Sequence, residues 1–392
     1  MKVSKMEIKE LQSKFIEKFG ENDKEVKRFF SPSRINIIGE HIDYNGGKVF
    51  PCALEIGTYA IARKNDDNVL NLYSLNMENN GKIDLDDLVY KKENDWMNYA
   101  AGMAKYIKES GFNIGGLDVL VYGNIPNGSG LSSSASLEML IGEIFNVFYN
   151  EKKIDRTKLS LLGQDTENKF FGLNTGIMDQ FIIANGKKDH ALLLDTNTLE
   201  FEHYPFDLKD NKIVILNTNK RRELKDSKYN ERRAQCDEAV AILKNYKDVK
   251  YLCELGEEDL HLLENIPDEI VRNRAKHAIL ENVRVKEAAQ ALQDGNIEQL
   301  GKLLIESNDS LRELYEVSGE HLDSITKHSN EFEYCLGARM TGAGFGGCGI
   351  AIVKEDKIEE FKKYVFEKYK EDTGLEAEFI SSNVGESVHE IK

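Results

Sequence analysis

The chain has 392 residues, 41% of them hydrophobic and 31% charged, which is enough for two hydrophobic cores and therefore for two domains. Its 52 basic and 68 acidic side chains give a net charge of −16, which disfavours nucleic acid and anionic membranes as partners. No apolar run approaches the length that spans a bilayer, and the first residues lack a signal-peptide core. The five cysteines are scattered without C-x-x-C spacing. We therefore expect a cytoplasmic protein with reduced, mostly buried thiols, without a disulfide frame or a zinc site.

Apolar periodicity along the chain predicts a mixture of helices and strands. Helical spacing is found at residues 6–29, 96–110, 137–145 and 154–171, and over most of 220–328. Strand patterns are found in short pieces between 29 and 63, and at 117–122, 191–194, 213–218 and 349–353. Because the two kinds of element do not alternate regularly, the pattern predicts an α+β fold with mixed or antiparallel sheets. No Gly/Ser-rich linker separates the halves, so we expect two closely packed domains, 1–187 and 188–392, with the active site in the cleft between them.

A glycine- and serine-rich stretch lies between a predicted strand and a predicted helix. Residues 123–138 read G-N-I-P-N-G-S-G-L-S-S-S-A-S-L-E. A glycine turn that enters a helix presents backbone N–H groups and the positive end of the helix dipole to an anion, usually phosphate. The alternative is a glycine turn with a serine N-cap and no ligand. The stretch has neither the Walker spacing nor G-x-G-x-x-G, and three successive serines favour a nucleotide-phosphate loop of another type.

A polar cluster follows an apolar strand near the N-terminus. Residues 34–47 read R-I-N-I-I-G-E-H-I-D-Y-N-G-G, with a glycine break just before the polar side chains. The donors and acceptors suit a polyhydroxylated ligand, and polar groups at a strand end beside a glycine commonly line a binding site. A solvated turn with internal salt bridges is the alternative.

Two carboxylates, Glu167 and Asp179, lie in apolar and aromatic surroundings on either side of Gly172 and Gly176. A buried carboxylate is costly unless it binds a metal, pairs with a cation or handles a proton. A surface helix residue and an N-cap are the alternative roles. Beside a phosphate loop, the sequence favours a metal ligand and a base.

A third stretch, residues 339–349, reads R-M-T-G-A-G-F-G-G-C-G, with five glycines in eight residues. Glycine in regular structure costs roughly 0.5–1 kcal/mol, and a structural turn rarely needs so many. This stretch predicts close approach of the backbone to another group.

Together these stretches resemble the galactokinase family, within the superfamily named for galactokinase, homoserine, mevalonate and phosphomevalonate kinases. R-I-N-I-I-G-E-H-I-D-Y-N-G-G is similar to the galactokinase signature, P-N-G-S-G-L-S-S-S-A-S-L-E to the superfamily's ATP loop, and G-A-R-M-T-G-A-G-F-G-G-C to its third motif. Weaker matches at residues 73–76, 96–102, 176–181 and Tyr229 follow in the family's order. The resemblance spans almost the whole chain.

The resemblance implies a role for each matching residue. Asp179 would be the proton acceptor and Arg34 its charged neighbour. Sugar contacts would come from Glu40, His41, Ile42, Asp43, Gly176 and Tyr229. The ATP phosphates would be wrapped by Gly128, Ser129, Gly130, Leu131, Ser132, Ser133 and Ser134, with Ser74 and Trp96 towards the nucleoside. Ser134 and Glu167 would bind Mg²⁺. Ile42 and Lys48 depart from the family's usual residues, threonine and an apolar side chain.

The implied reaction is ATP-dependent phosphorylation of the anomeric hydroxyl of galactose, the first step of galactose catabolism. Galactose and ATP are then the partners, and we expect a monomer, with oligomers left open. A kinase for N-acetylgalactosamine or arabinose is the alternative enzyme, and a galactose and ATP sensor without turnover is the alternative outside enzymes. A homoserine or mevalonate kinase is opposed by Glu40, His41 and Asp43, which suit a sugar.

Overall fold

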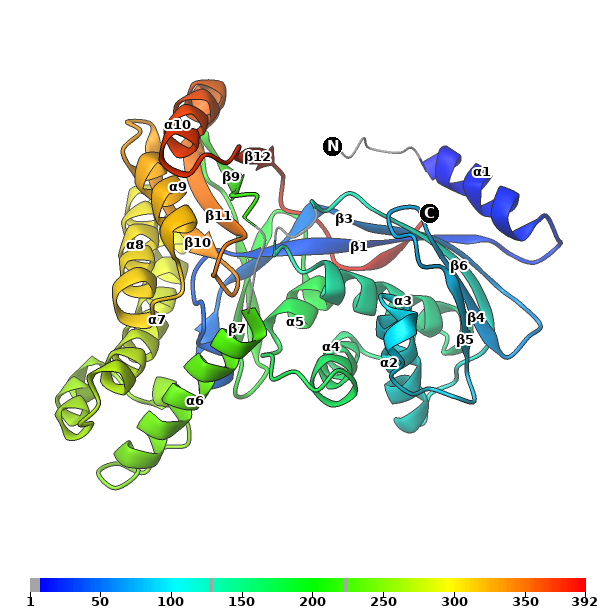
Figure 1. Ribbon diagram of the computed structural model, residues 1–392, viewed down its shortest axis with the longest axis horizontal. Coiled ribbons are helices and arrows are strands. Elements are labelled where there is room, and N and C mark those ends of the chain that lie inside the picture. The colour runs from blue at the N-terminus through cyan, green and yellow to red at the C-terminus, as the bar shows by residue number, and fades with distance from the viewer. Residues whose placement is uncertain (1–7, 127–129, 221–224) are drawn as a thin grey trace.

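The computed structural model describes residues 8–126, 130–220 and 225–392, except for the side chains of 225–227 (Figure 1). A long six-stranded sheet organises the first half of the chain. Its strands, in spatial order, are β13 (His389–Ile391), β1 (Lys27–Asn36), β3 (Pro51–Lys64), β6 (Leu117–Gly123), β4 (Val69–Ser74) and β5 (Gly81–Asp84). Neighbouring strands are antiparallel except for β4 and β6, which run parallel.

Helices cover both faces of this sheet. The helices on the lower face in Figure 1 are α2 (Met97–Glu109), α3 (Ser133–Tyr149), α4 (Arg156–Asp165) and α5 (Met178–Asn185). Helices α3 and α5 pack directly on β1 and β3, while α1 (Ile8–Phe19) packs on β3 and β6 from the other face. This arrangement brings the start of α3 and the start of α5 together beneath β1.

The second half is built on a four-stranded sheet with the order β10 (Cys335–Thr341), β11 (Cys348–Lys354), β9 (Asn211–Asn217) and β12 (Glu378–Ser381). The helices of this half are α6 (Lys225–Leu243), α7 (Glu269–Gln293), α8 (Ile297–Ser310), α9 (Glu320–Asn330) and α10 (Ile358–Thr373). Of these, α8 and α9 pack on β10, and α10 packs on β11. A small sheet of β2 (Lys48–Val49), β7 (His190–Asp195) and β8 (Phe201–Pro205) joins the halves, because β2 and β7 come from opposite sides of the predicted boundary.

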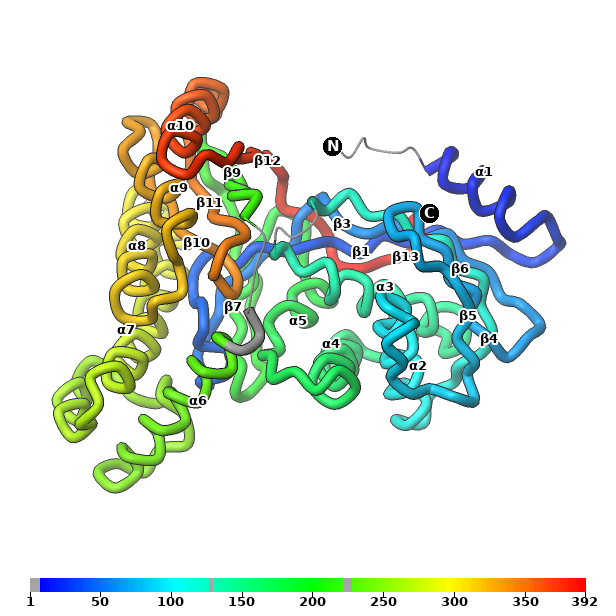
Figure 2. The backbone as a smooth tube through the Cα atoms, viewed as in Figure 1, coloured from blue at the N-terminus to red at the C-terminus, as the bar shows by residue number. Residues whose placement is uncertain are grey.

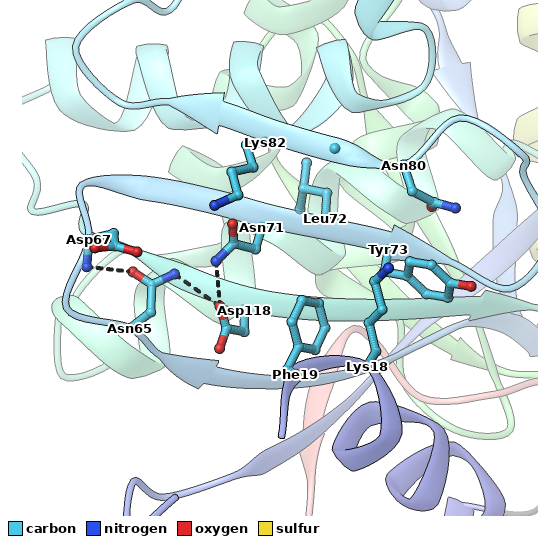
Figure 3. Close-up of a pocket in the computed structure, with 11 residues that line it drawn as sticks. Lys18, Phe19, Asn65, Asp67, Asn71, Leu72, Tyr73, Asn80, Lys82 and Asp118 are labelled. Carbon is cyan, nitrogen blue, oxygen red and sulfur yellow. Dashed lines mark hydrogen bonds between the residues drawn. The ribbon is translucent and has the colours of Figure 1, made fainter. Parts of the chain in front are cut away.

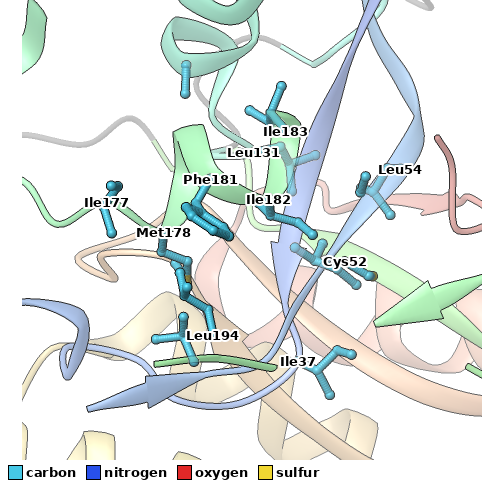
Figure 4. Packing of buried hydrophobic residues seen from close by; sticks show 14 of the residues in the cluster. Ile37, Cys52, Leu54, Leu131, Ile177, Met178, Phe181, Ile182, Ile183 and Leu194 are labelled. Atoms are coloured by element: carbon cyan, nitrogen blue, oxygen red, sulfur yellow. The ribbon is translucent and has the colours of Figure 1, made fainter. Parts of the chain in front are cut away.

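One continuous hydrophobic core runs through both halves. Figure 4 shows Phe181 and Ile182 of α5 among the side chains of Ile37, Cys52 and Leu54, which follow β1 or belong to β3. The same cluster continues into β9, β11, α7 and α8. The predicted α+β fold with two closely packed halves is therefore confirmed.

The structure differs from the sequence prediction in several details. The helix expected at 6–29 ends at Phe19, because Gly20 adopts a left-handed φ of 72°, and β1 begins at Lys27. Strands β4, β5, β8, β10 and β12 and helix α10 were not predicted. The C-terminal segment leaves the second half and returns to the first sheet as β13, beside β1 (Figure 2). The division at residue 188 stays a prediction, and the last strand crosses it.

The five cysteines form no disulfide, and four of them are buried. Within the described ranges, no helix combines the length and apolar character that crossing a membrane requires.

A hollow of about 490 Å³ lies on the outer face of the first sheet, beside the end of α1 (Figure 3). Its polar side chains largely bind one another. The carboxylate of Asp118 accepts hydrogen bonds from Arg63, Asn65 and Asn71. The hollow faces α1, whereas α3 and α5 cover the other face, so it is separate from the site described next.

Candidate active site

Arg34 and Asp179 form the centre of the site. Near the end of β1, the buried Arg34 guanidinium donates to both carboxylate oxygens of Asp179, at 2.7 Å through Nε and 2.8 Å through Nη2. Its third nitrogen, Nη1, donates at 3.0 Å to the carbonyl of Gly130 in the predicted phosphate loop. Burial lowers the pKa of Arg34, but the charge and hydrogen bonds of Asp179, together with the charges of Glu40 and Asp43, outweigh burial and raise the net pKa. Arg34 therefore stays charged and favours the ionised form of Asp179.

The predicted phosphate loop has the expected arrangement of strand, turn and helix. It connects β6 to α3, and Gly130 and Ser132 adopt left-handed φ values of 76° and 58°. Ser132 is the N-cap residue of α3, yet its side chain makes no capping bond, and its hydroxyl donates to Asp179 instead. A serine therefore occupies the N-cap position, as the alternative expects, but its side chain does not cap the helix. Gly128 and Ser129 lie outside the described residues.

The other loop side chains differ in exposure. Leu131 is buried, and its carbonyl accepts from the backbone N–H of Arg34 at 3.5 Å. Ser133 is exposed and Ser134 half-buried on the first turn of α3. The first turn of α3 therefore carries two accessible hydroxyl groups next to Ser132, the residue that contacts Asp179.

Oxygen atoms suited to a hard cation gather around Glu167. The Ser134 hydroxyl lies 3.3 Å from one oxygen of the Glu167 carboxylate, and the Thr175 hydroxyl lies 2.6 Å from the other. Mg²⁺ takes oxygen ligands and uses few protein groups beside water and substrate phosphates. The residues present fit that requirement. Among the described residues no group of three His, Cys, Asp or Glu side chains could hold a metal by itself.

The predicted sugar motif is anchored to the second half of the molecule. Gly39 adopts φ of 106°, and an added Cβ would lie 2.9 Å from the carbonyl of Lys48, so glycine is required. Its N–H donates at 3.0 Å to the buried carboxylate of Glu281 in α7. Burial opposes ionisation of Glu281, but the charges of Arg284, His277 and Arg339 and the Ser307 hydrogen bond together outweigh burial, and the pKa falls to about 2. A permanent charge from α7 therefore fixes the turn.

Glu40 contacts the third motif. Its carboxylate accepts at 2.7 Å from the N–H of Gly342 and at 3.0 Å from the amide of Asn36, and it lies 3.1 Å from the Thr341 hydroxyl. The buried guanidinium of Arg339 is 3.5 Å away. Burial nonetheless raises the pKa of Glu40 above its ordinary value. The close backbone approach predicted for the glycine-rich stretch is thus an approach to Glu40.

His41 follows in a left-handed conformation with φ of 62° and is 4% exposed. Burial and the neighbouring His277 lower its pKa to about 3, so the ring is neutral at physiological pH. Its Nε2 lies 3.3 Å from the carbonyl of Ala343, and the Tyr229 ring lies 5.6 Å away. A left-handed conformation is uncommon for histidine and costs roughly 1–3 kcal/mol. The surrounding contacts hold His41 in this conformation.

Asp43, Gly176 and Tyr229 meet beside Asp179. An added Cβ on Gly176 would lie 1.7 Å from the Asp43 carboxylate, so only glycine admits that carboxylate. Burial, with the nearby charges of Asp179 and Glu40, raises the pKa of Asp43 to about 7. Burial, followed by the charge of Asp43, also raises the pKa of Tyr229 well above its ordinary value. These three residues, predicted from different stretches, are brought together.

Ser74 and Trp96 lie on a different part of the first half. The loop after β4 contacts both, since the Ser74 N–H donates at 2.6 Å to Asn80, and the Trp96 indole N–H donates to the carbonyl of Asn79. Both residues are at least nine-tenths buried. Their predicted place towards the nucleoside stays a prediction.

Ile42 requires a correction. Its side chain is fully buried in the hydrophobic core and packs against Gly47, so it offers no surface to a sugar. Its carbonyl accepts from the N–H groups of Asn45 and Gly47, which closes the turn. The contact was implied by the resemblance alone, through the place of Ile42 in the matching motif. Lys48 pairs with Asp195 at 3.4 Å.

Several buried residues around the site were not predicted. Glu138 and Gln180 are both fully buried, and the amide of Gln180 donates at 3.0 Å to Glu138 behind Asp179. Burial, with a further contribution from the Glu167 charge, raises the pKa of Glu138 well above its ordinary value. The signal for this pair was a charged residue within the apolar face of the α3 sequence. Tyr315, which lies beside His41, and Glu281 carried no such signal. Their neighbours in the sequence are typical of solvent-exposed helices.

Comparison with known proteins decides the family. The galactokinase galactose-binding signature matches residues 13–64, and the GHMP kinase N-terminal and C-terminal domains match residues 98–187 and 288–371. A galactokinase of Clostridium tetani is 51% identical over 98% of this chain and 98% of its own length. A galactokinase of Ligilactobacillus salivarius is 52% identical over 97% and 99%. The chain belongs to the galactokinase family.

Solved structures agree with that family. A Lactococcus lactis galactokinase complexed with galactose is similar with a TM-score of 0.95 and 44% identity, covering 98% of this chain and all of that one. Methanococcus jannaschii mevalonate kinase is similar with a TM-score of 0.64 and 20% identity, over 93% of this chain and 99% of its own. The likeness to mevalonate kinase shows the fold alone. ATP as the co-substrate follows from membership of the galactokinase family.

Proposed function

We propose that this galactokinase-family chain transfers the γ-phosphoryl group of ATP to the anomeric hydroxyl of galactose, with Asp179 as the proton acceptor. The anomeric oxygen attacks the γ-phosphorus, its proton passes to Asp179, and ADP leaves with the electrons of the broken P–O bond. The products are galactose 1-phosphate and ADP. This chemistry depends on positioning and charge more than on covalent help from the protein.

The observation that carries the proposal is that Asp179 accepts hydrogen bonds from two sides. Arg34 binds it from the sugar-motif side, and Ser132 binds it from the phosphate-loop side. A base in this position is adjacent to both substrates, as proton transfer during phosphoryl transfer requires. Arg34 has the charge to stabilise negative charge that develops on the transferring group, because its third nitrogen already faces the loop at Gly130.

Sugar recognition is assigned to side chains near Asp179. Asp43, with a pKa of about 7, can accept or donate a hydrogen bond to a hydroxyl according to its protonation. His41 offers a neutral ring nitrogen, and the Tyr229 ring lies next to the rings of His41 and Tyr44. Glu40 supports this set by joining it to the third motif.

Mg²⁺ would be held by Ser134 and Glu167, together with the phosphates of ATP. When bound, it would neutralise phosphate charge. In support, Glu167 lies in a π-helical turn, Thr166–Phe170, and its carboxylate contacts the Ser134 hydroxyl. π-Helical turns often occur at functional positions.

The test is ADP formation by the purified protein with Mg²⁺ and ATP, across galactose, N-acetylgalactosamine, arabinose, glucose and no sugar. ³¹P NMR of the product identifies the phosphorylated position. Turnover restricted to galactose, with a 1-phosphate product, is the expected result. Preference for another sugar would contradict the substrate, and galactose binding without turnover would contradict the reaction.

A further inference from the structure

A chain of hydrogen bonds connects His41 to helix α6 in the second half of the molecule. Nδ1 of His41 lies 2.8 Å from the Tyr44 hydroxyl. That hydroxyl lies 2.8 Å from the Tyr315 hydroxyl, which in turn lies 3.1 Å from Sγ of Cys236. Nδ2 of Asn45 approaches the same sulfur at 3.5 Å. Tyr315 and Cys236 are fully buried, so each depends on these neighbours for its hydrogen bonds.

The direction of the chain follows first from the end at His41. Nε2 faces the carbonyl oxygen of Ala343, and a carbonyl only accepts. Nε2 must therefore carry the one proton of the neutral ring, and Nδ1 must accept. Tyr44 is then the donor to Nδ1. Because a phenol has one hydrogen, its oxygen accepts from Tyr315.

The other end gives the same direction. Nδ2 of Asn45 donates at 2.8 Å to the carbonyl of His41, which fixes the nitrogen side of that amide. The second hydrogen of Nδ2 is then directed to Sγ of Cys236, which accepts it. The hydroxyl hydrogen of Tyr315 is already given to Tyr44, so the thiol of Cys236 donates to Tyr315.

We propose that Tyr44, Tyr315 and Cys236 are positioning residues that hold His41 as the Nε2–H tautomer, so that an acceptor oxygen of the sugar can share or replace the Ala343 carbonyl as the acceptor of Nε2–H. The role towards the sugar rests on the function proposed above. The tautomer itself does not, and it can be measured without turnover.

Packing of the rings holds the same orientation. The Tyr315 ring lies 4.9 Å from the ring of His41 and 4.5 Å from that of His277. Nε2 of His277 lies 3.2 Å from the carbonyl of Glu40, so the peptide preceding His41 is held as well. The low pKa of His41 excludes the doubly protonated ring, in which both nitrogens would donate.

The direct test is ¹⁵N NMR of histidine-labelled protein without substrates, with His41→Gln to assign the His41 signals. The expected spectrum has a protonated Nε2 and an unprotonated Nδ1 at pH 7. Tyr44→Phe removes the donor to Nδ1 and keeps the ring, and it is expected to shift the tautomer towards a mixture. A protonated Nδ1 in the wild-type protein would overturn the proposal, whatever the enzyme activity.

Kinetics test the role towards the sugar. Loss of one hydrogen bond in Tyr44→Phe is expected to raise the KM for galactose about five- to tenfold while the KM for ATP stays unchanged. Tyr315→Phe and Cys236→Ala, further along the chain, are expected to raise it less, and Cys236→Ser keeps a donor and stays close to wild type. Tyr369→Phe is the matched control, because it removes a buried hydroxyl that donates to the carbonyl of Thr218. Equal effects of Tyr44→Phe and Tyr369→Phe on the galactose KM would overturn the proposal that Tyr44 positions His41.

Discussion

The guanidinium of Arg34 binds both carboxylate oxygens of Asp179, so that charge and orientation are fixed by one contact. Such a fork is specific to arginine, because lysine offers a point charge without the planar pair of donors. Arg34 approaches from β1 and Asp179 from the first turn of α5. The packing of α5 on β1 therefore determines how the base is aimed.

Asp179→Asn is expected to lower kcat on the order of 10²–10⁴-fold, since a positioned base contributes about that much. The amide has the shape of the carboxylate, so the fold should persist, which circular dichroism and a thermal melt can check. Arg34→Lys is the companion variant, because it keeps the charge and loses the fork. Near-normal turnover of Asp179→Asn would remove Asp179 from the role of base.

Glu167→Gln is expected to raise the Mg²⁺ concentration needed for half-maximal activity, because a neutral amide is a weaker ligand for a hard cation. Titration of Mg²⁺ at saturating ATP and galactose measures this. Ser132→Ala is the matched control from the same loop, since Ser132 donates to Asp179. It should lower kcat and leave the Mg²⁺ requirement unchanged. An unchanged requirement in Glu167→Gln would remove Glu167 from the metal site.

The sequence predicted the local parts of the site because each part lies within one short stretch. The strand, turn and helix around Ser132 were readable from glycine and serine spacing, and Glu167 and Asp179 were readable as carboxylates in apolar surroundings. The α+β class followed from irregular alternation. The pairing of strands that are far apart in the sequence could not be predicted. No local pattern indicates that β13 returns to β1, because three residues carry too little periodicity.

Contacts between the halves escaped prediction for the same reason. Glu281 and Tyr315 belong to helical segments whose sequences are typical of solvated helices, yet tertiary packing buries both. Ile42 shows the opposite error. The resemblance implied a ligand contact, whereas the turn directs the Ile42 side chain into the core. Burial is a property of the whole fold, and single-sequence patterns report it only where they are periodic.

Glu138→Gln is expected to retain most of the activity. Burial favours the protonated form of Glu138, and Oε1 of Glu138 and Oε1 of Gln180 are both buried without a hydrogen-bond partner. A glutamine reproduces the donor and acceptor of the protonated acid, while Glu138→Ala leaves a cavity and unsatisfied Gln180. The comparison of kcat and melting temperature for the two variants is the measurement. Equal losses in both would show that Glu138 is needed as a charge.

Gly176→Ala is expected to raise the KM for galactose, because the added Cβ would displace the Asp43 carboxylate. The KM for ATP should change little, since the contact lies on the sugar side of Asp179. Gly172→Ala is the control in the same loop, where φ is 74° and an added Cβ meets no atom within 4 Å. It strains the loop without touching Asp43. A similar rise of the galactose KM in both variants would attribute the effect to the loop as a whole.

His277 should make the protein sensitive to acid. Its pKa is lowered to about 4, chiefly by burial, whereas the unfolded chain takes up the proton near the ordinary value of about 6.5. Between these values only the unfolded state binds the proton, so stability falls as the pH falls, by up to about 1.4 kcal/mol per pH unit for one histidine. His41 contributes with the same sign down to about pH 3.

His277→Gln is therefore expected to flatten the pH dependence of the free energy of unfolding between pH 6.5 and 4, even if the variant is less stable throughout. Urea unfolding at several pH values gives the slope, which is independent of the constant cost of losing the bonds to Ser310 and Glu40. His261→Gln, at an exposed position, serves as the control and should keep the wild-type slope. A wild-type slope in His277→Gln would mean that His277 does not stay neutral in the folded state.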